Sequence, residues 1–113
     1  MPIVNLTRRV SLASSFEIAN TPLKRMRGLL GRVSLNAKEA LVITHCQSIH
    51  MFFMNFAIDV VFIDKANKVV GLCPKIQPFH LSPIFFNAFQ AIELPSGTIA
   101  SSNTQLGDLL QIG

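Results

Sequence analysis

The chain has 113 residues, of which 50% are hydrophobic and only 14% are charged, and its formal net charge is +4. This length fits a single domain, 1–113, and we expect no second one. No apolar run reaches the roughly 18 residues of a transmembrane helix, and polar and basic residues interrupt any signal-peptide core near the start. We therefore expect a cytoplasmic protein without a membrane span, in which Cys46 and Cys73 are free thiols.

The charge is both sparse and unevenly distributed. A charged fraction of 14%, against about 25% in a typical soluble domain, favours a large core or an apolar patch used for self-association or ligand binding. Most of the basic residues fall in the first third of the chain: Arg8, Arg9, Lys24, Arg25, Arg27 and Arg32. Such a cluster can attract nucleic acid, acidic ligands or a membrane surface, although a solvated basic face is the simpler interpretation.

The first third of the chain predicts strands followed by the main helix. Residues 3–19 alternate loosely between apolar and polar, which predicts one or two strands with Phe16 and Ile18 facing inward. A helix over about 22–31 follows, because a threonine N-cap and a closing glycine bracket an apolar stripe. Arg27 borders that stripe, where its guanidinium can reach a carboxylate at the sheet edge.

Short strands dominate the remainder of the chain. Residues 57–63 predict the strongest strand, which is apolar on both faces and therefore expected inside a sheet, with Asp59 as its one carboxylate. A hairpin turn over 64–68, in which Asn67 can take a positive φ, leads to the next strand. The other predicted elements are strands over 40–44, 69–73, 89–94 and 109–112, sheet structure over 49–53, an exposed loop over 75–84 and a short helical turn over 95–102.

These elements predict an α+β fold. We expect a small mixed or antiparallel sheet curling toward a barrel, with one main helix (about 22–31) and a short second helical turn, because only one segment is long enough to be a crossover helix.

Five sequence blocks carry a family resemblance. They are Thr21-Pro22 with Arg25-Met26-Arg27-Gly28-Leu29-Leu30-Gly31-Arg32, Cys46-Gln47-Ser48-Ile49-His50, Met54 with Phe56-Ala57-Ile58-Asp59-Val60-Val61-Phe62-Ile63-Asp64, Glu93-Leu94-Pro95-Ser96-Gly97-Thr98, and Leu106-Gly107-Asp108. In this order they resemble domain of unknown function family 192 (DUF192), a prokaryotic family, over nearly the whole chain. The resemblance implies a small β-rich domain with one long helix, and it brings no agreed biochemical activity.

The chain departs from the family pattern at three positions. Met51, Asn55 and Asn67 stand where threonine, a basic residue and glycine are common in the family. The change at Asn55 removes the base that would support an anion-binding role beside Met54.

Cys46 and His50 are the candidate catalytic pair. A histidine beside a thiol lowers the thiol pKa and makes it a nucleophile, whereas the simpler interpretation is that Cys46 packs as a small apolar residue and His50 hydrogen-bonds to a carbonyl. A metal site would use His45, Cys46 and His50 with His80 or Asp59. Because the paired spacing of a strong metal motif is missing, we predict neither a metal nor a cofactor.

Asp59 requires a partner, because an ionised carboxylate cannot stay unpaired on an apolar strand face. We predict that Asp59 is buried and contacts a cation or a cluster of donors, most simply Arg27 in an ion pair that joins the helix to the central strand. The alternative is a carboxylate that binds a ligand.

The function that these residues favour is a non-enzymatic module that binds a small ligand or a protein partner. Its predicted pocket is lined by His50, Phe52, Met54 and Asn55, with His80 facing the same cleft. The alternatives are a small enzyme that uses the cysteine and histidine pair, and a nucleic-acid binder that uses the basic first third. An oligomer is compatible with the composition.

Overall fold

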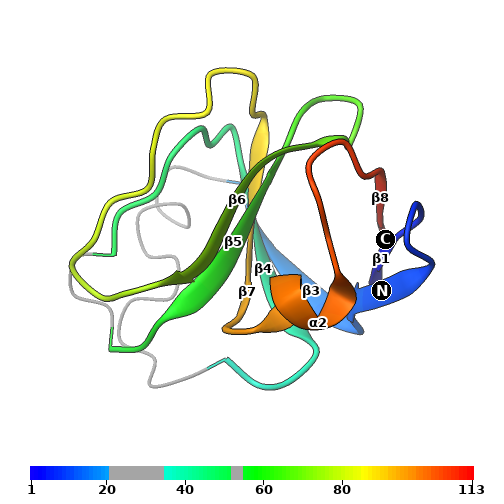
Figure 1. Ribbon diagram of the computed structural model, residues 1–113, viewed down its shortest axis with the longest axis horizontal. Coiled ribbons are helices and arrows are strands. Elements are labelled where there is room, and N and C mark those ends of the chain that lie inside the picture. Colours follow the sequence, from blue (N-terminus) through cyan, green and yellow to red (C-terminus); the bar gives the residue numbers. More distant parts are fainter. Residues whose placement is uncertain (21–34, 52–54) are drawn as a thin grey trace.

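The structure, a computed structural model, describes residues 1–20, 35–51 and 55–113 (Figure 1). Its elements are β1 (Ile3–Asn5), β2 (Val10–Ala13), β3 (Ser15–Ala19), β4 (Glu39–Thr44), β5 (Ile58–Ile63), β6 (Val69–Ile76), β7 (Gln90–Pro95), α2 (Thr98–Ser102) and β8 (Leu110–Ile112). The strands form a three-stranded sheet in the order β2-β1-β8 and a five-stranded sheet in the order β3-β4-β7-β5-β6. The described pairings are antiparallel except that of β3 with β4, which is parallel.

The five-stranded sheet separates two apolar clusters. On one face Val61, Ile63 and Ile92 pack toward the three-stranded sheet and α2. On the other face Val60 and Phe62 pack against loops. Figure 1 shows this arrangement, with α2 and the three-stranded sheet to the right of the long sheet and the loops to its left.

The strand predicted over 57–63 is confirmed as β5. All six of its residues are buried, and it pairs with β7 on one side and β6 on the other. The predicted hairpin turn follows: Asn67 has a φ of 62°, and the Asp64 carboxylate accepts hydrogen bonds from the N–H groups of Ala66 and Lys68, each at 2.9 Å. Both features are local, which is why the sequence predicts them well.

Strand β6 is longer than predicted. It runs to Ile76, so the strand predicted over 69–73 is too short, and the loop predicted over 75–84 begins two residues later. Pro74 lies within β6 although proline cannot donate to a strand ladder. It is tolerated because β6 is an outer strand of its sheet, where one side of the backbone needs no strand partner.

Two other predictions need correction. Ile18 does not face inward: it is 45% exposed on β3, an outer strand, whereas Phe16 is partly buried against the core. The described part of 49–53 is not a strand, because its sheet contact is a single bridge between His50 and Leu81.

The α+β class holds only in a broad sense. The described residues form mostly β structure with one short helix, α2, while the helix predicted over about 22–31 lies outside them. The mixed sheet is confirmed, but the predicted curl toward a barrel is wrong for the described strands. The outer strands β3 and β6 do not pair with each other, and the strands divide into two sheets instead. No helix of the described chain is long and apolar enough to cross a membrane.

Candidate functional site

The candidate site lies on the face of the five-stranded sheet that is turned away from α2. The strand register places four residues in a row across this face: Leu41 on β4, Glu93 on β7, Val60 on β5 and Cys73 on β6. Residues paired on neighbouring strands point to the same side of a sheet. The Glu93 carboxyl therefore stands in a row whose other members belong to an apolar cluster.

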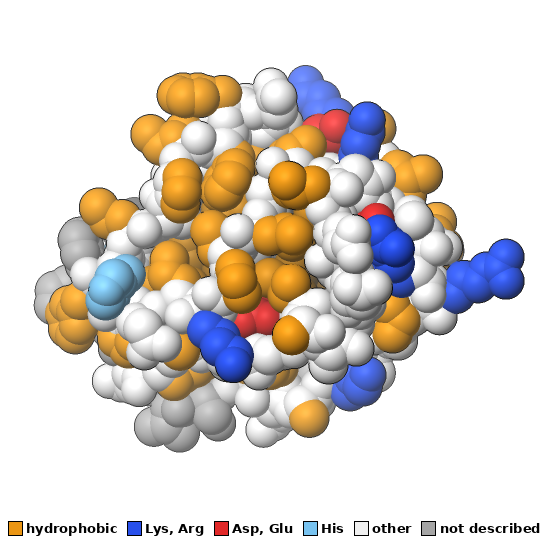
Figure 2. Space-filling view, viewed as in Figure 1, with side chains coloured by type: hydrophobic (Ala, Val, Ile, Leu, Met, Phe, Trp, Pro, Cys, Tyr) orange, Lys and Arg blue, Asp and Glu red, His pale blue; other side chains and the backbone are white. Residues whose placement is uncertain are grey.

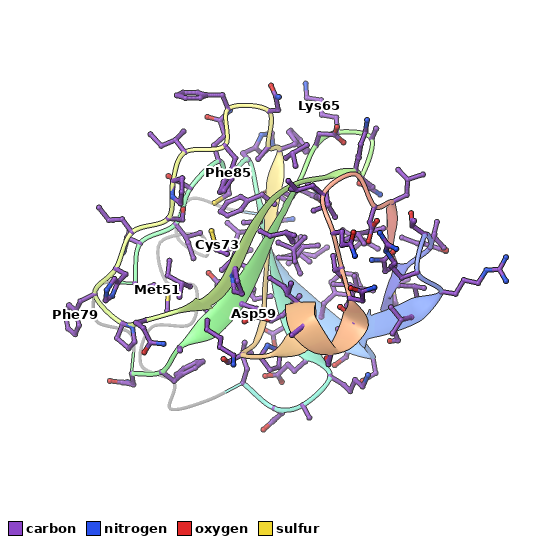
Figure 3. All side chains as sticks on the ribbon, in the orientation of Figure 1. Met51, Asp59, Lys65, Cys73, Phe79 and Phe85 are labelled. Carbon is purple, nitrogen blue, oxygen red and sulfur yellow. The ribbon has the colours of Figure 1, made fainter. Side chains whose placement is uncertain are left out.

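Two loop segments, 45–51 and 77–89, cover this face. The N–H of Met51 donates to the carbonyl oxygen of His80 at 2.8 Å, which is one of several backbone hydrogen bonds between the two segments. Met51 is buried and belongs to the same cluster as the strand residues beneath it. In Figure 3, Met51 and Cys73 lie on the same side of the sheet.

Glu93 is a buried carboxyl that the described residues leave unsatisfied. Its side chain is only 6% exposed, and its Oε2 atom has no hydrogen-bond partner among them. Burial raises the pKa of Glu93 from 4.5 to about 7, because the apolar surroundings disfavour the charged form. A buried carboxyl with a displaced pKa is typical of functional sites.

Asp59 presents the opposite case on the other face of β5. It is fully buried, its Oδ1 accepts a hydrogen bond from the N–H of Lys75 at 2.8 Å, and its Oδ2 accepts one from the N–H of Ile99 at 2.7 Å. These bonds join β5 to β6 and α2. Arg27, the predicted partner of Asp59, lies outside the described residues, so that ion pair stays a prediction.

The predicted binding residues that the structure describes lie on or beside the loop cover. His50 and His80 are both exposed, and the bridge between His50 and Leu81 brings the two segments that carry them together. Nδ1 of His80 lies 3.0 Å from the carbonyl oxygen of Pro78. Asn55 is exposed as well.

Phe52 and Met54 lie outside the described residues, so the pocket predicted around them stays a prediction. The thiol of Cys46 donates a hydrogen bond to the carbonyl oxygen of Ser48 at 3.1 Å, a bond that belongs to the protonated thiol. Burial raises the pKa of the Cys73 thiol, which lowers its nucleophilic fraction at neutral pH. Catalysis by Cys46 also stays a prediction, to be tested by its alkylation rate against pH.

A separate groove of about 860 Å³ opens between the 64–68 hairpin and residues 86–89. Lys65 and Lys68 line it, and the Lys65 Nζ atom lies 5.5 Å from the centre of the Phe89 ring. The ring of His45 packs edge-on against the same phenylalanine at 4.7 Å. No group of three or more His, Cys, Asp or Glu side chains in the described ranges is placed to hold a metal ion.

Glu93 is absent from the predicted site residues. The sequence carried a signal for it, because Glu93 is the one carboxyl in the apolar strand predicted over 89–94, as Asp59 is in the strand over 57–63. The same argument from buried charge applies to both positions.

Sequence comparisons identify the family of the chain. The model of family DUF192, described as an uncharacterised ACR, matches residues 4–112. A UPF0127 protein of Thermococcus sibiricus is 33% identical over 110 residues, covering 94% of this chain and 71% of the relative. A UPF0127 protein of Pyrococcus horikoshii is 30% identical over 112 residues and covers 96% of both chains.

Solved structures share the fold. A protein of unknown function from Novosphingobium aromaticivorans superposes with a TM-score of 0.87 at 18% identity, covering 99% of this chain and 84% of that one. A Sinorhizobium meliloti protein, proposed to be a transcription regulator, superposes with a TM-score of 0.78 at 18% identity, covering 97% and 89%. At this identity the likeness concerns the fold alone. The family match over nearly the full length, together with the archaeal relatives, shows that the chain belongs to the DUF192 family of UPF0127 proteins.

Proposed function

We propose that this chain is a cytoplasmic, non-enzymatic module that binds a small amine through the carboxylate of Glu93. The observation that carries the proposal is Glu93 itself, which is 6% exposed and has an unpartnered Oε2 atom among the described residues. An unsatisfied buried polar group costs about 1–3 kcal/mol, and more when it is charged. A donor supplied by a ligand would remove that cost.

The contrast with Asp59 supports this role. Both carboxyls lie on interior strands that pair with each other, Asp59 opposite Leu94 and Glu93 opposite Val60. Asp59 receives two backbone hydrogen bonds, so this fold does supply donors to a buried carboxylate that has a structural task. The described residues supply no donor to Oε2 of Glu93, which suits a group whose partner arrives from outside.

An ammonium group fits the chemistry of Glu93. It donates hydrogen bonds and carries the opposite charge, so it would favour the ionised carboxylate over the neutral acid. The apolar body of such a ligand would contact residues at the margin of the same cluster, where Cys73, Ile76 and Phe85 are partly buried. We therefore expect primary amines with an aromatic or alkyl body to bind.

The test uses 2-phenylethylamine and its neutral counterpart 2-phenylethanol. At about pH 8 most Glu93 side chains are ionised, and the amine should raise the Tm of the wild-type protein more than the alcohol does. Glu93→Gln should abolish the difference between the two compounds. Glu17→Gln, which removes an exposed carboxylate from β3, should keep it.

Two results would contradict the proposal. The first is an amine response of equal size in the wild type and in Glu93→Gln. The second is a wild-type protein whose Tm responds alike to the amine and to the alcohol at saturating concentrations.

A further inference from the structure

The loop from residue 77 to 89 exposes a row of large apolar side chains. Phe79 is 63% exposed, Leu81 66%, Ile84 57% and Phe86 78%. The loop runs along the upper-left margin of the molecule in Figure 1, and hydrophobic side chains project from that margin in Figure 2. Several large apolar side chains exposed on one loop indicate an interaction site.

The loop is held in place from within. The N–H of Phe79 donates to the carbonyl oxygen of Met51 at 2.6 Å, and the N–H of Ser82 donates to that of Ile49 at 3.0 Å. The hydroxyl of Ser82 in turn accepts a hydrogen bond from the N–H of Ile49 at 2.9 Å. Because the backbone bonds point toward the domain, the apolar row is a fixed part of the surface.

Positive charge adjoins one end of the row. Phe86 belongs to the row and also lines the groove that contains Lys65 and Lys68. Residues 77–89 contain no Asp or Glu. The one carboxylate in the groove, Asp64, uses its Oδ1 atom to accept two backbone hydrogen bonds in the hairpin turn. The surface therefore combines apolar side chains with neighbouring ammonium groups.

We propose that this row and the adjoining groove form a docking surface for an anionic lipid bilayer. Phe79, Leu81, Ile84 and Phe86 enter the interfacial region of the bilayer, and the groove receives a lipid phosphate beside Lys65 and Lys68. Peripheral membrane proteins use this combination, because apolar insertion and attraction to anionic headgroups add to each other. The net charge of +4 acts in the same direction.

A bilayer fits this surface better than a protein partner does. The four exposed side chains belong to one loop, and that loop runs along a single margin of the molecule (Figure 1). A specific protein interface would instead centre on a well-packed apolar core with a polar rim around it. The lysines at one end match phosphates, which lie at the level just outside the apolar layer of a bilayer.

The test is co-sedimentation with vesicles of phosphatidylcholine alone and of phosphatidylcholine with roughly one third phosphatidylglycerol. The wild-type protein should bind the anionic vesicles, and its binding should weaken as salt rises. The double variant Phe79→Ser/Phe86→Ser should bind at least roughly tenfold more weakly, because two large apolar side chains leave the bilayer. The double variant Lys65→Gln/Lys68→Gln should bind the anionic vesicles more weakly than the wild type does. Its binding to phosphatidylcholine vesicles should equal that of the wild type.

Leu106→Ser is the matched control. Leu106 is 65% exposed, lies outside the loop, and should be dispensable for vesicle binding. The substituted loop side chains are exposed, so the loop variants should fold. Tm values equal to that of the wild type would show that they do. The proposal is overturned if the wild type does not bind the anionic vesicles, if Leu106→Ser loses as much binding as the loop variant, or if free glycerol phosphate at millimolar concentration displaces the protein completely. It is also overturned if the wild type is a dimer that Phe79→Ser/Phe86→Ser converts to a monomer, since a second copy would then occupy the row.

Discussion

Replacing Glu93 with glutamine should remove a pH dependence from the stability of this protein. Burial raises the pKa of the carboxyl from 4.5 to about 7. Between these two values the folded protein keeps a proton that the unfolded chain has already released. The free energy of unfolding therefore falls as the pH rises through this interval, and it levels off above about pH 7. Below the ordinary pKa both states are protonated, and the penalty is absent.

The size of this effect follows from the two pKa values. Each pH unit between them is worth about 1.4 kcal/mol, so the wild-type protein should lose about 3 kcal/mol of stability between the ordinary pKa of 4.5 and a pH of about 7. Glutamine at this position does not titrate. Its contribution to the free energy of unfolding is therefore the same at every pH. The stability of Glu93→Gln relative to the wild type should rise by about 3 kcal/mol across the interval.

Urea denaturation at a series of pH values from about 5 to about 8 measures this difference directly. Glu17→Gln, at an exposed position on β3, provides the control and should follow the wild-type curve. The reasoning is refuted if the curves of the wild type and Glu93→Gln stay parallel over this range, because Glu93 would then have similar proton affinities in the folded and unfolded chains.

Asp108, the other carboxyl with a displaced pKa, does not interfere with this measurement. Its burial alone would raise the pKa, but hydrogen bonds from Arg8 at 3.0 Å, Asn5 at 2.9 Å and the N–H of Gln105 at 2.9 Å, with the charge of Arg8, outweigh burial and lower it. The stability that Asp108 contributes is present above its ordinary pKa of 3.8 and is lost only as the pH falls below that value.

Two further predictions concern packing and hydrogen bonding near the site. Asp59→Ala strands the buried N–H donor of Ile99 and the partly buried one of Lys75, and it should lower the free energy of unfolding by about 2–6 kcal/mol in urea denaturation, since each stranded donor costs about 1–3 kcal/mol; a change under about 1 kcal/mol would contradict the structural role. Gly71→Ala would place a Cβ atom 2.5 Å from the Phe85 ring and should cost about 1–3 kcal/mol. Adding Phe85→Leu should recover part of that loss in a double-mutant cycle, and strictly additive effects would show that the two residues do not clash.

The parts of the fold that the sequence predicts are those fixed by neighbouring residues. The apolar run of β5 and the turn chemistry of Asp64 and Asn67 lie within ten residues of one another, and the structure has them as predicted. The sequence underestimates the length of β6, because proline normally interrupts strands and Pro74 lies within this one. That residue is compatible with β6 only because of the outer position of the strand, which is a property of the whole sheet.

The candidate site depends on hydrogen bonds between residues that are far apart in the sequence, and these bonds cannot be predicted from neighbouring residues. Asp59 and Glu93 look alike in the sequence, since each is a single carboxyl in an apolar strand. Asp59 is satisfied by donors that are 16 and 40 residues away, on β6 and at the start of α2. Because β-sheet pairing decides which backbone N–H groups reach which face, the difference between a satisfied and an unsatisfied carboxyl emerges only in the folded chain.

The adjacent residues Phe85 and Phe86 show how one loop can serve two surfaces. The Phe85 ring packs against Phe62 with ring centres 4.6 Å apart, and it lies so close to Gly71 that any side chain there would collide with it. Phe86 is 78% exposed and lines the groove. The close approach to Gly71 thus fixes which phenylalanine covers the Glu93 face of the sheet and which one is presented outward. Because Phe85 faces the sheet and Phe86 faces outward, the amine site and the bilayer surface that we propose lie on opposite sides of this loop.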